Sequence, residues 1–241
     1  MTKLSVNLNK IALLRNSRGR DYPNVVEFAK KFIDLGVQGI TIHPRDDERH
    51  ITRKDAYDLA IFLKSKPQLE FNIEGYPSDS FLALVHELKP SQCTLVPDSP
   101  EQLTSDHGWN ISQNSSFLLG VCESLNAKSI RSALFIDPDF EQIKQVPQTK
   151  AQRIELYTES YANSYSTEQH GEVFNQYKKS AELAQSLNIG VNAGHDLDLS
   201  NLQQFLTIDS ILEVSIGHAL TIEAIEQGMA LVVSRYLQIC Q

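Results

Sequence analysis

Short runs of β-branched and apolar residues alternate with helical stretches along the whole of this 241-residue chain. Such runs predict buried strands, and helices between successive strands favour a parallel sheet. The predicted strands are Leu4–Leu8, Gly39–His43, Glu70–Glu74, Gln92–Val96, Ser132–Ile136, Arg153–Tyr157, Gly190–Asn192 and Glu213–Ile216. Eight strand–helix units in a chain of this length predict a (β/α)8 barrel, and we expect residues 1–241 to form a single domain.

The stretches between the strands show the spacing of an apolar helix face. The clearest are Asn24–Leu35, Ser78–Leu88, Asn175–Leu187 and Thr221–Ile239. Ser78 is expected to be an N-cap. An open doubly wound sheet is the alternative architecture, but the first strand lacks the Gly-x-Gly-x-x-Gly turn that would favour it. The long connections Asn16–Asn24 and Asp98–Gln113 are expected to be functional loops.

The net charge and the cysteine content exclude some classes of protein. The formal net charge of −8 argues against a broad nucleic-acid-binding surface, although it leaves room for a local basic pocket. Cys93, Cys122 and Cys240 are far apart and odd in number, which predicts reduced thiols in a cytoplasmic protein. The N-terminus lacks the apolar core of a signal peptide, and no apolar run is long enough to span a membrane.

A dense basic cluster follows the second predicted strand. It comprises His43, Arg45, Arg49 and His50, all within eight residues. Crowding these groups is costly unless an anion neutralises them, so the cluster indicates a site for a phosphorylated or carboxylated substrate. The alternative is a solvated basic loop, balanced by the three acidic residues at positions 46–48.

Polar residues recur where the other predicted strands end, which is where barrel enzymes have their active sites. They are Asn7, Asn9, Lys10, Glu74, Asp137, Glu155, Tyr157, Asn192, His195, Ser215, Gly217 and His218. Apolar neighbours of Glu74 could raise its pKa and make it a base near neutrality, although a structural salt bridge remains open. Glu155 alternates with apolar neighbours, so it points either into the barrel or outward.

Two Gly-His pairs follow the seventh and eighth predicted strands. Gly194-His195 and Gly217-His218 let a ligand approach the backbone, and the second precedes a helix whose N–H groups can bind phosphate. Capping or core histidines are the alternative. The remaining histidines at positions 86, 107 and 170 are expected at the surface, and because no pair has metal-ligand spacing we predict no metal.

In order along nearly the whole chain, the sequence resembles the pyridoxine 5′-phosphate synthase family of deoxyxylulose-phosphate-dependent vitamin B6 synthesis. The matching blocks are Val6-Asn7-Leu-Asn9-Lys10-Ile-Ala, Leu14-Arg15-Asn16-Ser-Arg18-Gly19, Gly39-Ile-Thr-Ile-His43-Pro-Arg45-Asp-Asp-Glu-Arg49-His50-Ile51, Asn72-Ile-Glu74-Gly, Thr94-Leu-Val-Pro97, Phe135-Ile-Asp137, Val191-Asn-Ala-Gly-His195 and Ile216-Gly217-His218-Ala.

The resemblance implies a (β/α)8 TIM barrel with extra helices, assembled as a homo-octamer. It also implies condensation of 1-deoxy-D-xylulose 5-phosphate with 3-amino-2-oxopropyl phosphate to pyridoxine 5′-phosphate, phosphate and water, with no metal or organic cofactor. Two phosphorylated substrates need two anion sites, and imine formation, phosphate loss and ring closure need several proton transfers.

The family's functional residues match positions of this chain. The resemblance makes His43 and Glu74 proton acceptors, His195 a proton donor and Glu155 a support for the transition state. The substrate contacts that it implies are Asn7, Arg18, Gly217 and His218 for the aminoketone phosphate, and Arg45, His50 and Thr104 for the sugar phosphate.

Three positions depart from the commoner family pattern. Asn9-Lys10 replaces Asp-His, Asp196 replaces the Gly after the last catalytic histidine, and Tyr157-Thr-Glu159 replaces His-Thr-Gly. We expect Asn9, Lys10 and Asp196 to remain substrate contacts with altered chemistry. Another phosphosugar isomerase or epimerase, and a non-catalytic barrel that binds phosphate ligands, stay open as alternatives.

Overall fold

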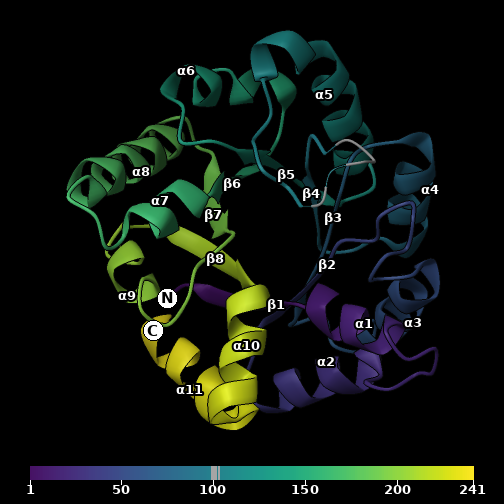
Figure 1. Ribbon diagram of the computed structural model, residues 1–241. Helices are drawn as coiled ribbons and strands as arrows, with labels where there is room; N and C mark the ends of the chain where they lie inside the picture. The colour runs from purple at the N-terminus through teal and green to yellow at the C-terminus, as the bar shows by residue number, and fades with distance from the viewer. Residues whose placement is uncertain (99–101, 103) are drawn as a thin grey trace.

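The computed structural model describes residues 1–98, 102 and 104–241, and its centre is a closed barrel of eight parallel strands (Figure 1). The strands are β1 (Lys3–Asn7), β2 (Gly39–Ile42), β3 (Glu70–Gly75), β4 (Gln92–Leu95), β5 (Arg131–Ile136), β6 (Arg153–Tyr157), β7 (Gly190–Gly194) and β8 (Ile211–Ile216). Each strand pairs with the next, and β1 closes the ring because Val6 lies beside both Ile40 and Ile216. The predicted (β/α)8 barrel is confirmed.

Helices surround the barrel on all sides in Figure 1. They are α1 (Asn9–Asn16), α2 (Val25–Asp34), α3 (Arg53–Leu63), α4 (Asp79–Leu88), α5 (Ile111–Asn126), α6 (Phe140–Ile143), the 3-10 helix η1 (Val146–Thr149), α7 (Glu159–Ser164), α8 (His170–Ser186), α9 (Leu202–Phe205), α10 (His218–Gln227) and α11 (Met229–Ile239). The segments after β1, β6 and β8 each carry two helices, so the extra helices are present.

Local signals fix where several helices begin. The Ser78 side chain accepts a hydrogen bond from the Phe81 N–H, which confirms the predicted N-cap of α4. Thr52 and Asp55 form a reciprocal capping box at the start of α3. Each cap satisfies backbone N–H groups that would otherwise lack a partner in the first helical turn.

Alternation along the strands divides apolar from polar side chains. Leu4, Val6, Ile40 and Ile42 belong to the buried apolar core. The polar side chains at the intervening positions point to the barrel axis, because they bond across it to strands that are not neighbours. Gln92 on β4, for example, donates to the carboxylate of Glu213 on β8. The barrel interior is therefore polar, which is unusual for a layer that branched apolar residues commonly fill.

Two helical features differ from the predictions. The helix α1 was not predicted; it lies between β1 and the expected connection Asn16–Asn24, which joins α1 to α2. The predicted helix Thr221–Ile239 is two helices, because Gly228 interrupts it with a left-handed φ of 93°. The alternation of strands and helices is otherwise as predicted.

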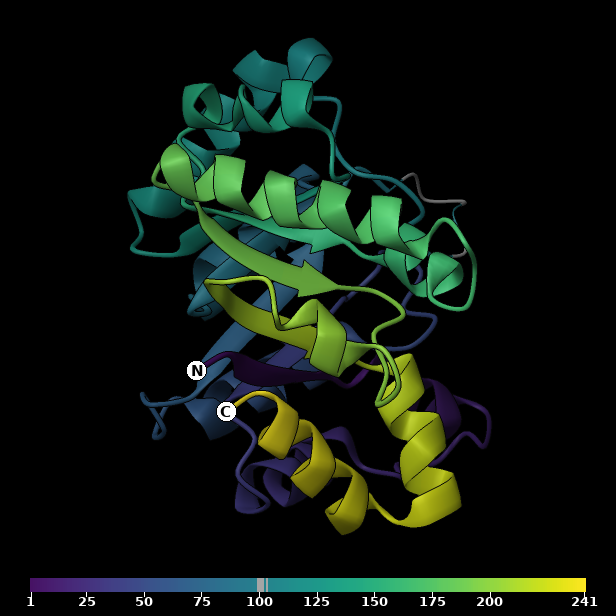
Figure 2. The ribbon, with the colours of Figure 1, turned by 90° about the vertical axis from the view of Figure 1, so that its left-hand side faces the viewer.

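The two ends of the barrel differ in the segments that lie beside them. In Figure 2 the strand arrowheads point away from the chain termini, which lie together at the amino ends of the strands. Near the arrowheads lie α10, α7 and the loop between β7 and α9. Within the described parts of the chain, no helix is long and apolar enough to cross a membrane.

Candidate active site

The carboxyl ends of the strands gather the predicted acid–base residues around one mouth. Asn7 ends β1, His43 follows β2, Glu74 lies near the end of β3, and His195 follows β7. Because all strands are parallel, these residues meet at the same end of the barrel. The fold thus brings together positions that lie up to 188 residues apart.

His43 and Glu74 are direct neighbours in this mouth. The imidazole Nδ1 of His43 and Oε2 of Glu74 are 4.0 Å apart, and Asn7 Nδ2 donates to the same oxygen at 3.4 Å. The Asn9 side-chain oxygen accepts the backbone N–H of His43 at 3.0 Å. Asn9 therefore holds the backbone of the candidate base, a role that the sequence did not indicate.

Burial is the largest influence on the pKa values of His43, His50 and Glu74. It lowers the pKa of His43 well below its usual value, with Arg45 and His50 adding repulsion. It also raises the pKa of Glu74 well above the usual range, an effect that the negative charge of Glu155 strengthens. The pKa of His50 falls to about 4 for the same reason, burial first and then Arg45.

Acidic side chains partner both arginines of the basic cluster. Arg45 forms an ion pair with Asp98, which is 3% exposed and also accepts the Ser105 hydroxyl at 2.7 Å. Arg49 pairs with Asp47 at 2.7 Å. Asp98 lies three residues after the end of β4, and our inventory of strand ends missed it. Arg49 is half-buried and also donates to the Gln102 carbonyl at 2.8 Å, while the Arg45 side chain is 9% exposed. These contacts do not fit a freely solvated loop.

Glu155 points inward from the middle of β6, below the mouth. It is 3% exposed, and its Oε2 accepts the Thr94 hydroxyl at 3.3 Å across the barrel. Burial, reinforced by Glu213, raises the pKa of Glu155 to about 8. The choice between inward and outward orientation is thereby settled, although the residue is not at the strand end.

His195 stands on the opposite side of the mouth from His43. Its Nε2 lies 3.4 Å from the Thr104 hydroxyl, and its Nδ1 lies 2.9 Å from Asp196 Oδ2. The Tyr157 ring packs against the imidazole in an edge-on arrangement, with ring centroids 5.0 Å apart. Thr104 therefore lies beside a candidate catalytic residue, and its expected contact with the sugar phosphate stays a prediction.

The start of α10 supplies the candidate phosphate site. Gly217 precedes the helix and His218 is its first residue. A Cβ at Gly217 would lie 3.0 Å from the Asn7 Cβ, so the glycine allows close approach of these strand ends. Lys10 lies in the first turn of α1, and Arg18 is exposed in the turn that follows α1.

Part of the predicted functional loop Asp98–Gln113 is anchored to the barrel. The Trp109 indole N–H donates to the Leu95 carbonyl at 2.9 Å, and the Gly108 N–H donates to Asp137 at 3.0 Å. Positions 99–101 and 103 of that loop lie outside the described residues. The anchored segment carries Thr104 toward His195, which places this loop at the mouth as expected.

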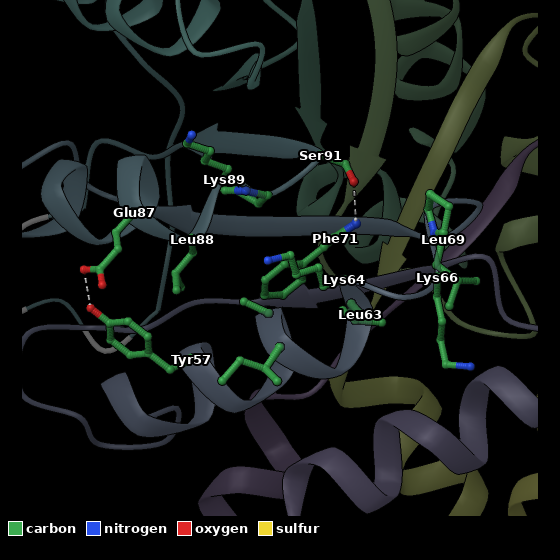
Figure 3. A pocket seen from close by; sticks show the side chains of 14 residues that line it. Tyr57, Leu63, Lys64, Lys66, Leu69, Phe71, Glu87, Leu88, Lys89 and Ser91 are labelled. Atoms are coloured by element: carbon green, nitrogen blue, oxygen red, sulfur yellow. Dashed lines mark hydrogen bonds between the residues drawn. The ribbon is translucent and has the colours of Figure 1, made fainter.

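Two cavities compete as candidate sites. One, of about 320 Å³, lies at the mouth and is lined by His43, Arg45, Tyr76 and Asp98, among others. The other, of about 580 Å³, lies between α3 and α4 near the amino ends of β3 and β4 (Figure 3). Its Glu87 carboxylate bonds to the Tyr57 hydroxyl. The smaller cavity is the better candidate because it contains perturbed acid–base groups.

The remaining histidines fall into two groups. His107 is exposed, as predicted. The prediction was wrong for His170, which packs against Tyr161, Tyr165 and Phe174 and whose Nε2 is buried without a hydrogen-bond partner. His86 is half-buried in α4. Among the described residues, no group of three or more His, Cys, Asp or Glu is placed to hold a metal ion.

Comparison of the sequence with known proteins gives independent evidence about the family of this chain. The family described as "Pyridoxal phosphate biosynthesis protein PdxJ" matches residues 4–241. The pyridoxine 5′-phosphate synthase of Bacteroides fragilis is 48% identical over 237 residues, which cover 98% of each chain. That of Flavobacterium johnsoniae is 47% identical over 239 residues, or 99% of each chain.

Solved structures of low sequence identity agree on the fold alone. Phosphoribosyl anthranilate isomerase from Thermotoga maritima superposes with a TM-score of 0.60 at 10% identity, covering 100% of this chain and 98% of that one. A protein from Aquifex aeolicus superposes with a TM-score of 0.66 at 14% identity, covering 100% and 93%. Barrels of this fold catalyse many different reactions. The structural similarity therefore does not identify the reaction, which has to be inferred from the residues of the site.

Proposed function

The chain belongs to the PdxJ family of pyridoxal phosphate biosynthesis proteins, and on that premise we propose that it condenses two phosphorylated substrates into pyridoxine 5′-phosphate. The substrates are 1-deoxy-D-xylulose 5-phosphate and 3-amino-2-oxopropyl phosphate. Phosphate and water leave as the ring closes. The chain is thus an enzyme of vitamin B6 synthesis, and neither the isomerase nor the non-catalytic alternative is favoured by its relatives.

One structural observation supports acid–base chemistry at this site most directly. A buried imidazole and a buried carboxyl group, His43 and Glu74, face each other 4.0 Å apart at the mouth. His43 accepts protons, and Glu74 does so once it has ionised. His195, across the mouth, returns a proton to a leaving oxygen. Glu155 below them stabilises charge that develops in the transition state.

Each substrate needs its own phosphate site. Backbone N–H groups at Gly217 and His218, with Asn7 and Arg18, hold the aminoketone phosphate at the start of α10. Arg45, His50 and Thr104 hold the sugar phosphate on the other side. The ion pair between Arg45 and Asp98 supports this assignment, because Asp98 holds the guanidinium in place at the mouth until phosphate competes for it.

A product assay tests the proposed function. Both substrates are incubated with the protein, and pyridoxine phosphate absorbance and released phosphate are followed together. Equal amounts of the two products are expected. Phosphate release without the pyridine chromophore, or conversion of the ketose phosphate alone, would contradict the synthase. Omission of either substrate is the control for background hydrolysis.

We also propose a homo-octamer in a reducing compartment such as the cytoplasm. Leu13 and Leu14 on α1, and Ile222 and Ile225 on α10, are exposed apolar residues on two helices that contact each other. Such a surface is suited to burial between subunits. Cys93, Cys122 and Cys240 are free thiols, all buried. Light scattering that detects only a 27.1 kDa species would refute the assembly.

A further inference from the structure

His195 and Asp196 form a side-chain pair where β7 ends. The carboxylate of Asp196 engages Nδ1 of the imidazole at 2.9 Å, while Nε2 faces the Thr104 hydroxyl at 3.4 Å. The two ring nitrogens thus have different partners. Nδ1 is bonded to the Asp196 carboxylate, whereas Nε2 points toward the Thr104 hydroxyl.

The backbone holds this pair in an uncommon conformation. His195 has a φ of 86° and Asp196 a φ of 59°, values that L-residues rarely adopt unless their surroundings impose them. The Thr158 hydroxyl donates to the carbonyl oxygens of Gly194 and His195, and the Asn201 amide donates to that of Asp196 at 3.1 Å. Three anchored carbonyls therefore keep the carboxylate beside the imidazole.

Charged groups on the neighbouring elements keep Asp196 ionised. Its bond to His195 lowers the pKa of the Asp196 carboxyl group, and His218 on α10 and Lys10 on α1 add to this. The Tyr157 ring from β6 packs against His195, and its hydroxyl bonds to Glu159 on α7. Asp196 is therefore the carboxylate that bonds directly to the imidazole in the described residues.

We propose that Asp196 is a positioning residue that orients the imidazole ring of His195. The carboxylate fixes Nδ1–H toward itself and so presents Nε2, the nitrogen that gives up the proton, to the substrate. The inference rests on the proposed function of His195 as proton donor, and it concerns how that histidine is held.

The replacement Asp196→Asn tests this role, because it keeps shape and an acceptor oxygen but removes the charge. Nitrogen-15 NMR of the His195 ring reports which nitrogen carries the proton, and we expect the Nδ1–H form of the parent to give way to a mixture of the two tautomers. We also expect kcat to fall with little change in KM, since the ring is no longer held in the orientation that donates its proton. His195→Gln identifies the resonance. Asp58→Asn, which removes a surface carboxylate paired with Lys54 on α3, is the matched control and should change neither the tautomer nor kcat.

The outcomes separate the two proposals. An unchanged tautomer of the His195 ring in Asp196→Asn overturns the positioning role, whatever happens to turnover. Absence of pyridoxine phosphate from the parent protein refutes the proposed function instead, because the NMR measurement needs no turnover. If Asp196→Asn does not fold, Asp196→Gly provides the same readout, since glycine adopts a left-handed backbone readily.

Discussion

His43 Nδ1 and Glu74 Oε2 lie 4.0 Å apart on neighbouring strands, and burial drives their pKa values in opposite directions. Burial therefore favours the uncharged form of both groups. An uncharged imidazole can accept a proton directly, whereas an uncharged carboxyl group must first lose its own. Arg45 is the nearby charge that favours this ionisation. Under the proposed function, this difference makes His43 the more available of the two proton acceptors.

The replacement Glu74→Gln should leave the fold intact and lower turnover by roughly 10²–10⁴-fold, the usual contribution of a general base. Glutamine keeps the size of the side chain and its contact with Asn7, so the loss would be chemical. Initial rates of pyridoxine phosphate formation, with circular dichroism to verify folding, measure it. Glu87→Gln on the outside of α4 is the control. Near-normal turnover in Glu74→Gln would remove it from the mechanism.

Glu155 should make the protein less stable as pH rises. Its folded pKa of about 8 lies above the ordinary carboxyl value of 4.5, so the neutral acid stabilises the fold fully below about pH 4.5. That contribution is lost as pH rises through the folded pKa, at about 1.4 kcal/mol per unit. Glu155→Gln stays neutral throughout, so its advantage in melting temperature over the parent should grow between about pH 5 and pH 8. Parallel melting curves across this range would contradict the prediction.

The strand–helix alternation made the fold predictable, and β6 was predicted with its observed bounds, Arg153–Tyr157. α1 was missed for a physical reason. It follows β1 without a turn, and it exposes Leu13 and Leu14, so its apolar residues do not mark one buried face. Periodicity detects a helix only when its apolar side faces the core.

Some residues of the candidate site could be predicted from the sequence, and others could not. Residues at strand ends could be found because topology alone brings parallel strand ends together. Partners across the fold could not, since Asp98 lies 53 residues from Arg45 and Asp55 lies 40 residues from Arg15, with which it pairs in the buried region between α1 and α3. Such pairings depend on how distant elements pack against one another, which no local pattern encodes.

The replacement Gly217→Val should weaken binding of the aminoketone phosphate more than of the sugar phosphate. A side chain at Gly217 would meet Asn7 at about 3.0 Å and cover the N–H groups at the start of α10. We expect KM for the aminoketone phosphate to rise roughly tenfold, equivalent to about 1.4 kcal/mol. Gly120→Val in α5, where a side chain meets nothing within 4 Å, is the matched control. An equal rise for both substrates would mean that the phosphate site is assigned to the wrong substrate.

Lys10 raises a mechanistic alternative, because a lysine at a barrel mouth can form a Schiff base with a ketose. We predict instead that it acts as a fixed positive charge. The aminoketone already carries the amine that enters the ring, so an enzyme amine would be redundant. The electrostatic influence of Lys10 reaches His50 and Asp196, on opposite sides of the mouth, and it lowers the pKa of both. A charge in that position attracts both phosphorylated substrates.

Lys10→Met should therefore raise KM, more steeply at low ionic strength where charges are least screened, and leave measurable turnover. Lys54→Met on the exposed face of α3 removes the same charge away from the mouth and is the control for net charge. Borohydride reduction in the presence of deoxyxylulose phosphate, followed by mass spectrometry, separates the two roles. The electrostatic role predicts no adduct, since no carbon–nitrogen bond forms at Lys10. A reduced adduct on Lys10, together with complete loss of turnover in Lys10→Met, would establish covalent catalysis in its place.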